Sequence, residues 1–139
     1  MNIQVFNDPP MDLLASIEQD ISRGPRSSVT TILCDQDYPL GIAYIAATVS
    51  GEPAGAALLR FLGDGGVELH KIVVVSRFRR RGVASQLFNA AVSRCRQEGV
   101  KSLVFRPLED SFDFWDETLQ HLPYPYRIHD EVKVIEIDL

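Results

Sequence analysis

Residues 73–84 read VVVSRFRRRGVA, and this stretch decides the fold. Its three consecutive valines favour a strand, because β-branched residues pack well on a pleated sheet. After Gly82 the apolar residues recur with the 3.6-residue period of a helix, at Val83, Ala84, Leu87, Phe88, Ala91, Val92 and Cys95. The sequence therefore predicts a strand, a basic turn and an amphipathic helix in direct succession.

The predicted turn has the properties of an anion site. The first N–H groups of a helix lack acceptors within the helix, and the helix dipole adds positive charge there. Four guanidinium groups surround this point, from Arg77, Arg79, Arg80 and Arg81. Phosphate is the anion that such helix starts commonly bind. We therefore expect the turn to hold a phosphate-bearing ligand.

Length and composition limit the class of protein. The 139 residues suffice for one core, so we expect a single domain over residues 1–139. No apolar run approaches the roughly 20 residues of a membrane helix. The first residues lack the basic start and apolar core of a signal peptide, which predicts a cytoplasmic protein with no membrane partner. Cys34 and Cys95 have no metal-ligand spacing, so we expect no metal, and Cys95 falls on the apolar side of the helix as a buried thiol.

The distribution of charge is more informative than its sum of -5. Between Lys71 and Lys101 there are eight basic residues and one acid, Glu98, whereas the rest of the chain has six basic residues and eighteen acids. An acidic protein is unsuited to general nucleic-acid binding, which requires a basic surface. The sequence predicts one local anion site on an acidic body that favours cationic partners, including amines.

The remaining elements surround this central segment. The predicted strands are short apolar or alternating runs bounded by turn residues, at 3–5, 42–49, 54–62, 67–75, 102–105, 126–129 and 132–137. Further helices are predicted at 11–23 and 111–119, and Gly99 is placed to end the central helix. The segment 26–40 has only a weak pattern. Because a helix joins them, strands 67–75 and 102–105 should be parallel.

Residues 79–84, RRRGVA, fit the pattern Gln/Arg-x-x-Gly-x-Gly/Ala, which resembles the acetyl-CoA motif of the GNAT superfamily of N-acetyltransferases. Residues 68–74, ELHKIVV, look like the strand before that motif, and the order of elements is similar over the whole chain. The resemblance implies an α/β (α+β) chain with the GNAT-like acyl-CoA N-acyltransferase fold. That fold has a mixed central sheet of about six to seven strands with helices on both faces.

The resemblance also implies which residues bind acetyl-CoA, the expected co-substrate. In the family the pyrophosphate sits on backbone amides at the helix start, where Gly82 would let the backbone approach the phosphates. The strand before the motif splays from its parallel neighbour and pairs with the pantetheine amides. Carried onto this chain, the cofactor-binding residues are Ile72, Val74, Arg79, Arg80, Arg81, Gly82, Val83, Ala84 and Ser85.

Glu68 is the expected catalytic base. It lies eleven positions before Arg79, which matches the glutamate that deprotonates the amine in some members of the family. Partial burial beside a cleft would raise the pKa of such a carboxyl toward that of a useful base. Strand alternation places His70 on the same face, and His70 is the alternative base because imidazole titrates near neutrality.

The chain departs from the family in the short helix at 111–119. Many members have Asn-x-x-Ala-x-x-aromatic-Tyr there, followed by Gly-Phe, and the tyrosine protonates the departing thiolate. This chain has Leu108, Ser111, Phe114 and Trp115 at those positions, and no Gly-Phe follows. An indole N–H cannot act as the acid, so Trp115 is expected in the core or the cofactor wall. Tyr124, Tyr126 or water would then protonate the thiolate.

These observations predict an enzyme that transfers an acetyl group from acetyl-CoA to a primary amine by direct attack. The acceptor would be a small-molecule amine or a protein amine, and an exposed terminal strand would permit a homodimer. The missing tyrosine favours one alternative, a catalytically weak or inactive CoA-binding module or partner subunit. A nucleic-acid binder using the arginine turn is a further alternative, which the acidic pI of about 5.1 disfavours.

Overall fold

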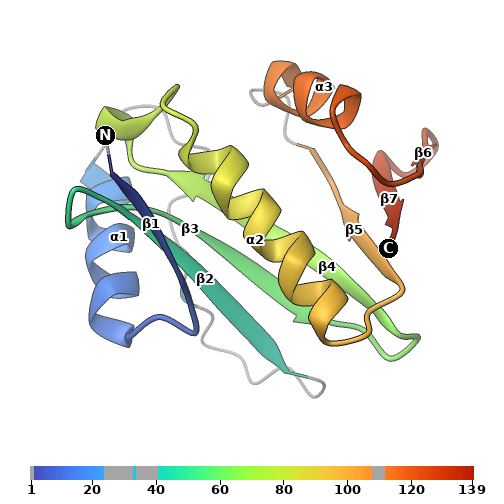
Figure 1. The fold of residues 1–139 in the computed structure, drawn as a ribbon, viewed down its shortest axis with the longest axis horizontal. Coiled ribbons are helices and arrows are strands. Elements are labelled where there is room, and N and C mark those ends of the chain that lie inside the picture. The colour runs from blue at the N-terminus through green and yellow to red at the C-terminus, as the bar shows by residue number, and fades with distance from the viewer. Residues whose placement is uncertain (1, 24–32, 34–40, 108–111) are drawn as a thin grey trace.

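A computed structural model describes residues 2–23, 33, 41–107 and 112–139 of the chain. These residues form a mixed sheet with helices packed on it (Figure 1). In chain order the elements are β1 (Ile3–Asn7), α1 (Met11–Arg23), β2 (Ile42–Val49), β3 (Glu52–Phe61), β4 (Gly66–Val74), the 3-10 turn η1 (Ser76–Phe78), α2 (Val83–Gln97), β5 (Ser102–Phe105), α3 (Phe112–Gln120), β6 (Tyr126–His129) and β7 (Val134–Asp138).

The sheet has seven strands in the order β1-β2-β3-β4-β5-β7-β6. All neighbours are antiparallel except β4 and β5, which are parallel as predicted, because α2 carries the chain back to the starting end. The mixed α/β class, the strand number and the parallel pair are confirmed.

Helices cover both faces of the sheet at its centre. Residues 54–59 of β3 are all buried, although their side chains point alternately to opposite faces. In Figure 1, α2 lies across β3 and β4 in front of the sheet and α1 packs behind it. The core therefore lies on both sides of β3.

Element boundaries differ from the predicted ones where turns adopt left-handed backbone. The β2–β3 turn contains only Ser50 and Gly51, at φ 50° and 85°, so β3 begins at Glu52 rather than at residue 54. The last hairpin turn is wider than predicted, because Lys133 has φ 57° and β7 begins only at Val134. The outer strand of that hairpin is β6.

The C-terminal end of α2 is as predicted. Gly99 has φ 74°, and the N–H of Val100 donates to the Cys95 carbonyl at 2.9 Å, a bond that closes the last turn around a left-handed glycine.

Trp115 belongs to the core. It is 4% exposed and packs against Phe105 of β5 at 4.2 Å and Phe88 of α2 at 5.3 Å between ring centroids. This aromatic cluster joins α3 to the sheet and to α2, so the expectation of a core role for Trp115 is confirmed.

Two predictions fall on parts of the chain that are not described. The weakly patterned segment 26–40, apart from Leu33, lies outside the described residues, as do Leu108 and Ser111. Of the helices described, none is long and apolar enough to cross a membrane.

Candidate active site

β4 and β5 separate soon after they begin. They pair only through Gly66 with Ser102, Val67 with Leu103 and Glu68 with Val104, whereas β4 continues to Val74. Within the described part of the chain, residues 69–74 of β4 therefore have no partner strand on the β5 side. The backbone N–H and carbonyl groups on this side of β4 are therefore unpaired with any described strand, although β4 is an inner strand of the sheet.

A bulge in β4 accompanies this separation. Leu59 pairs with Leu69 but Leu58 pairs with Lys71, so His70 is an extra residue on β4. A bulge bends its strand and increases the local twist. The bend lies directly after Glu68, the last residue that pairs with β5.

Gly55 lets β3 follow the bent strand closely. A Cβ atom on Gly55 would lie 2.6 Å from the Val73 carbonyl oxygen and 3.2 Å from a Leu87 methyl carbon on α2. Contacts this short exclude any side chain. The position therefore requires glycine for space.

The hydrogen bonds of β4 show which backbone groups face the open edge. The Val75 N–H donates to the Ala54 carbonyl of β3 at 2.7 Å, whereas the Val74 carbonyl accepts a hydrogen bond from Arg79 Nε at 3.2 Å. Peptide groups alternate along a strand, so Ile72 presents its N–H and carbonyl on the same side as Val74. Both residues expected to pair with pantetheine thus face the edge that β5 leaves open.

The turn after β4 exposes N–H groups at the start of α2. Arg80 and Gly82 are left-handed, at φ 63° and 85°. The first helical hydrogen bond runs from the Gln86 N–H to the Gly82 carbonyl at 3.1 Å, and no side chain among the described residues caps this start. The N–H groups of Val83, Ala84 and Ser85 precede that bond. The helix start is thus available to an anion.

The arginines of the turn have different contacts. Arg77 lies 3.5 Å from an Asp20 carboxylate oxygen on α1, and its guanidinium carbon is 4.7 Å from the centre of the Phe78 ring. Arg79 lies against the Val74 carbonyl, and Arg81 stands 5.9 Å from the Phe78 ring. All of them are exposed side chains, so the turn carries a concentration of positive charge at the surface.

Glu68 belongs to a cluster of three side chains, which we call the Arg60 cluster: Arg60, Glu68 and His70. Glu68 Oε1 lies 3.4 Å from Arg60 Nε and 3.4 Å from His70 Nδ1. Arg60 Nη1 lies 3.1 Å from Nδ1 and 3.2 Å from Nε2 of His70. Arg60 is directly opposite Glu68 in the β3–β4 register, and the three side chains are 23–36% exposed. The sequence identified Glu68 and His70 but missed Arg60.

The environment of His70 lowers its pKa. Partial burial is the largest cause, and the positive charges of Arg60 and Lys71 act in the same direction, while Glu68 opposes them. His70 is therefore a neutral imidazole at pH 7, with a nitrogen lone pair that can accept a proton.

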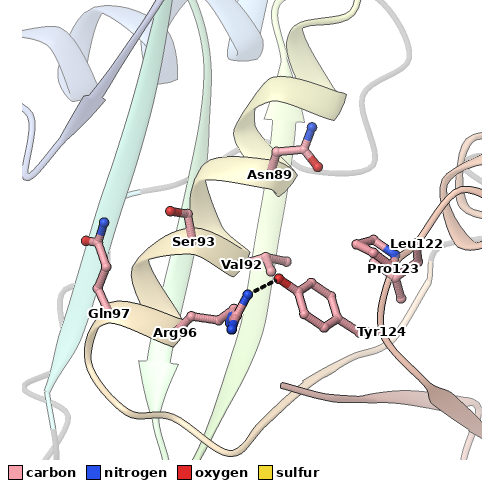
Figure 2. Close-up of a pocket in the computed structure, with 8 residues that line it drawn as sticks. All are labelled: Asn89, Val92, Ser93, Arg96, Gln97, Leu122, Pro123 and Tyr124. Atoms are coloured by element: carbon pink, nitrogen blue, oxygen red, sulfur yellow. Dashed lines mark hydrogen bonds between the residues drawn. The ribbon is translucent and has the colours of Figure 1, made fainter.

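Tyr124 and Tyr126 are not brought to the Arg60 cluster. The Tyr124 hydroxyl accepts a hydrogen bond from Arg96 of α2 at 2.5 Å, on one side of a groove of about 430 Å³ to which β4 contributes no lining residue (Figure 2). Tyr126 lies on β6, and β5 and β7 stand between β6 and β4. The role of either phenol as the acid for the departing thiolate stays a prediction.

Comparisons with known proteins agree with this geometry. The sequence profile of the acetyltransferase (GNAT) family matches residues 11–119. No match was found among curated proteins.

Solved structures share the fold at low sequence identity. The PaiA N-acetyltransferase from Thermoplasma acidophilum in complex with coenzyme A has a TM-score of 0.71 at 10% identity, with 100% of each chain covered. A GNAT family acetyltransferase from Staphylococcus aureus Mu50 has a TM-score of 0.70 at 11% identity, with 99% of each chain covered. The ribosomal-protein-S18-alanine N-acetyltransferase from Escherichia coli has a TM-score of 0.64 at 17% identity, covering 98% of this chain and 90% of the other.

Proposed function

The chain belongs to the acetyltransferase (GNAT) family, and we propose that it transfers an acetyl group from acetyl-CoA to a primary amine. One observation carries the proposal: the open edge of β4 leads directly into the uncapped start of α2. An extended chain ending in a diphosphate matches this arrangement, because its amides need strand-like partners and its phosphates need N–H donors.

The cofactor-binding residues would act mainly through their backbone. Val83 is buried, so its side chain would not contact the phosphates. The proposed donors are the N–H groups of Arg79, Arg80, Arg81, Gly82, Val83, Ala84 and Ser85. A Cβ atom on Gly82 would meet no atom of the described residues within 4 Å, apart from its two chain neighbours, which supports open space in front of the turn for a ligand. Ile72 and Val74 would pair with the pantetheine amides once Arg79 leaves the Val74 carbonyl.

Transfer would proceed by direct attack. Glu68 accepts a proton from the ammonium form of the acceptor, and the neutral amine then attacks the thioester carbonyl. The C–N bond forms first and gives a tetrahedral oxyanion, which a backbone N–H near Val74 stabilises. The C–S bond breaks when this intermediate collapses, and the second proton of the nitrogen passes to water. The CoA thiolate leaves and then takes a proton from water, which is feasible because a thiol is acidic enough to leave as its anion.

The acceptor would be a cationic amine, on a small molecule or a protein. Outside residues 71–101 the chain carries eighteen acids and six basic residues, so its field attracts cations. The Escherichia coli neighbour named above acts on an alanine of ribosomal protein S18, which shows that this fold can serve a protein acceptor.

Calorimetry with CoA and a thiol-release assay with acetyl-CoA and a panel of amines test the proposal. Gly82→Glu should weaken CoA binding at least about tenfold, because a carboxylate would stand where phosphate binds. Glu68→Gln should keep CoA binding and lose roughly 10²-fold or more in kcat. Wild-type protein that fails to bind CoA overturns the proposal, and binding without thiol release for any amine would instead indicate a CoA-binding module.

A further inference from the structure

The Arg60 cluster differs from an ordinary surface ion pair in the way its members are connected. The arginine contacts both the carboxylate and the imidazole, and its two partners also contact each other. All three side chains are at least partly buried, at a bend in the strand that the proposed transfer uses. A change in any one charge therefore acts on both others.

We propose that Arg60 is a positioning residue that holds Glu68 and His70 together as one proton-accepting unit. The inference rests on the proposed function and extends it. Glu68 takes the proton from the acceptor ammonium, and His70 then takes it from Glu68, which regenerates the carboxylate. His70 releases the proton to solvent, to which its side chain is 35% exposed.

An arginine suits this role because its positive charge is permanent. Its guanidinium is always protonated, so it pairs with the Glu68 carboxylate and favours the neutral form of His70. The charged groups that face His70 are Arg60 from β3, and Glu68 and Lys71 from β4. Arg60 and Lys71 lower the pKa of His70, and Glu68 raises it. Without Arg60, the pKa of the imidazole would be higher, so His70 would release its proton to solvent more slowly and regenerate its free lone pair less often.

The same chain contains a second Arg–Glu–His set that serves as a matched control. Arg127 on β6 lies 3.2 Å from Glu136 and 3.1 Å from Asp138, and His129 lies 3.0 Å from Glu136. In that set the arginine contacts two carboxylates, whereas Arg60 contacts a carboxylate and an imidazole. The control set lies on β6 and β7, which β5 separates from β4.

Titration of the histidine rings by NMR tests the cluster without any substrate. Arg60→Gln should raise the pKa of His70, Glu68→Gln should lower it, and Arg60→Lys should leave it close to the wild-type value. Resonances are assigned with His70→Gln, since the chain has three histidines. An unchanged His70 pKa in both Arg60→Gln and Glu68→Gln overturns the inference, even if the protein proves to be inactive.

The pH dependence of kcat/KM provides the second measurement. The acid limb should move to higher pH in Arg60→Gln and return in Arg60→Lys, while Arg127→Gln leaves it in place. His70→Gln should lower kcat about tenfold or more and leave CoA affinity unchanged. The relay is contradicted if His70→Gln keeps the wild-type kcat, or if Arg60→Gln and Arg127→Gln have the same pH profile of kcat/KM. If the wild-type protein releases no thiol with any amine, the proposed function itself is contradicted.

Discussion

At the scale of single residues, the turn before α2 depends on torsion rather than on space. Gly82 has φ 85°, a value that costs an L-residue roughly 1–2 kcal/mol. Among the described residues, no atom beyond the two chain neighbours lies within 4 Å of the position that a Cβ would occupy. A steric reason for glycine here would therefore come from a bound ligand and not from the described part of the protein.

Gly82→Ala and Gly65→Ala form a matched pair. Gly65 has φ 86° and equally free space, but it lies in the turn before β4, at the other end of that strand. Each variant should lower the free energy of unfolding by about 1 kcal/mol, measured by urea denaturation. Only Gly82→Ala should weaken CoA binding in calorimetry. Equal loss of affinity in both variants would mean that the turn does not contact the phosphates.

At the scale of secondary-structure elements, β4 is defined by its register as much as by its composition. Gly55 in β3 approaches β4 at the Val73 carbonyl, whereas Gly66 approaches the ends of the Ser102 and Asp64 side chains. A backbone carbonyl cannot rotate away from a new methyl group, but a side-chain oxygen can.

Gly55→Ala should therefore destabilise the protein more than Gly66→Ala. The first substitution forces β3 and β4 apart and should cost about 1–3 kcal/mol in the free energy of unfolding, by urea denaturation. The second is absorbed by a side-chain rotation and should cost less than about 1 kcal/mol. A larger loss in Gly66→Ala would show that the β3–β4 approach is not tight in solution.

Register also explains what could and could not be predicted from the sequence. Helical period and glycine placement indicated α2 and its two ends, because those signals are local. A turn at 63–66, as the sequence suggests, would pair Arg60 with Leu69, on the opposite face from Glu68. The actual hairpin pairs Arg60 with Glu68, and the bulge at His70 then brings the imidazole beside them. A shift of one residue exchanges the faces of a strand, so Arg60 could not be found without the pairing.

At the scale of the whole molecule, α2 is the element that holds the core together. It packs against β1, β2, β3 and β4, and Phe88 connects it through the aromatic cluster to β5 and α3. Cys95 lies on its buried side with no exposed surface. Burial raises the pKa of that thiol to about 11, with a smaller contribution from Glu98, so the thiolate is rare at pH 8.

Reaction of Cys95 should report unfolding of the whole molecule. In Cys34→Ser, a thiol reagent at pH 8 should leave Cys95 unmodified in water and react fully in urea, with Cys34→Ser/Cys95→Ala as the blank. The raised pKa of Cys95 favours the folded state below about pH 9, and this contribution is lost as the pH rises toward 11. The urea midpoint of Cys34→Ser should therefore fall between about pH 9 and pH 11. The midpoint of the Cys34→Ser/Cys95→Ala blank should fall less over the same range. Rapid modification of Cys95 in water would show that this thiol is not buried in solution.

The separation of β4 from β5 also bears on self-association. An exposed strand edge normally invites pairing with another molecule, and proteins must protect it. The outer edges of this sheet belong to β1 and β6, but the free side of β4 lies between α2 and β5, inside the sheet (Figure 1). In the proposed function a single extended chain pairs with this side of β4, which is not an outer edge of the sheet because β5 follows it in the strand order. The protein can thus keep backbone donors and acceptors open for a ligand without the aggregation that an open edge would bring.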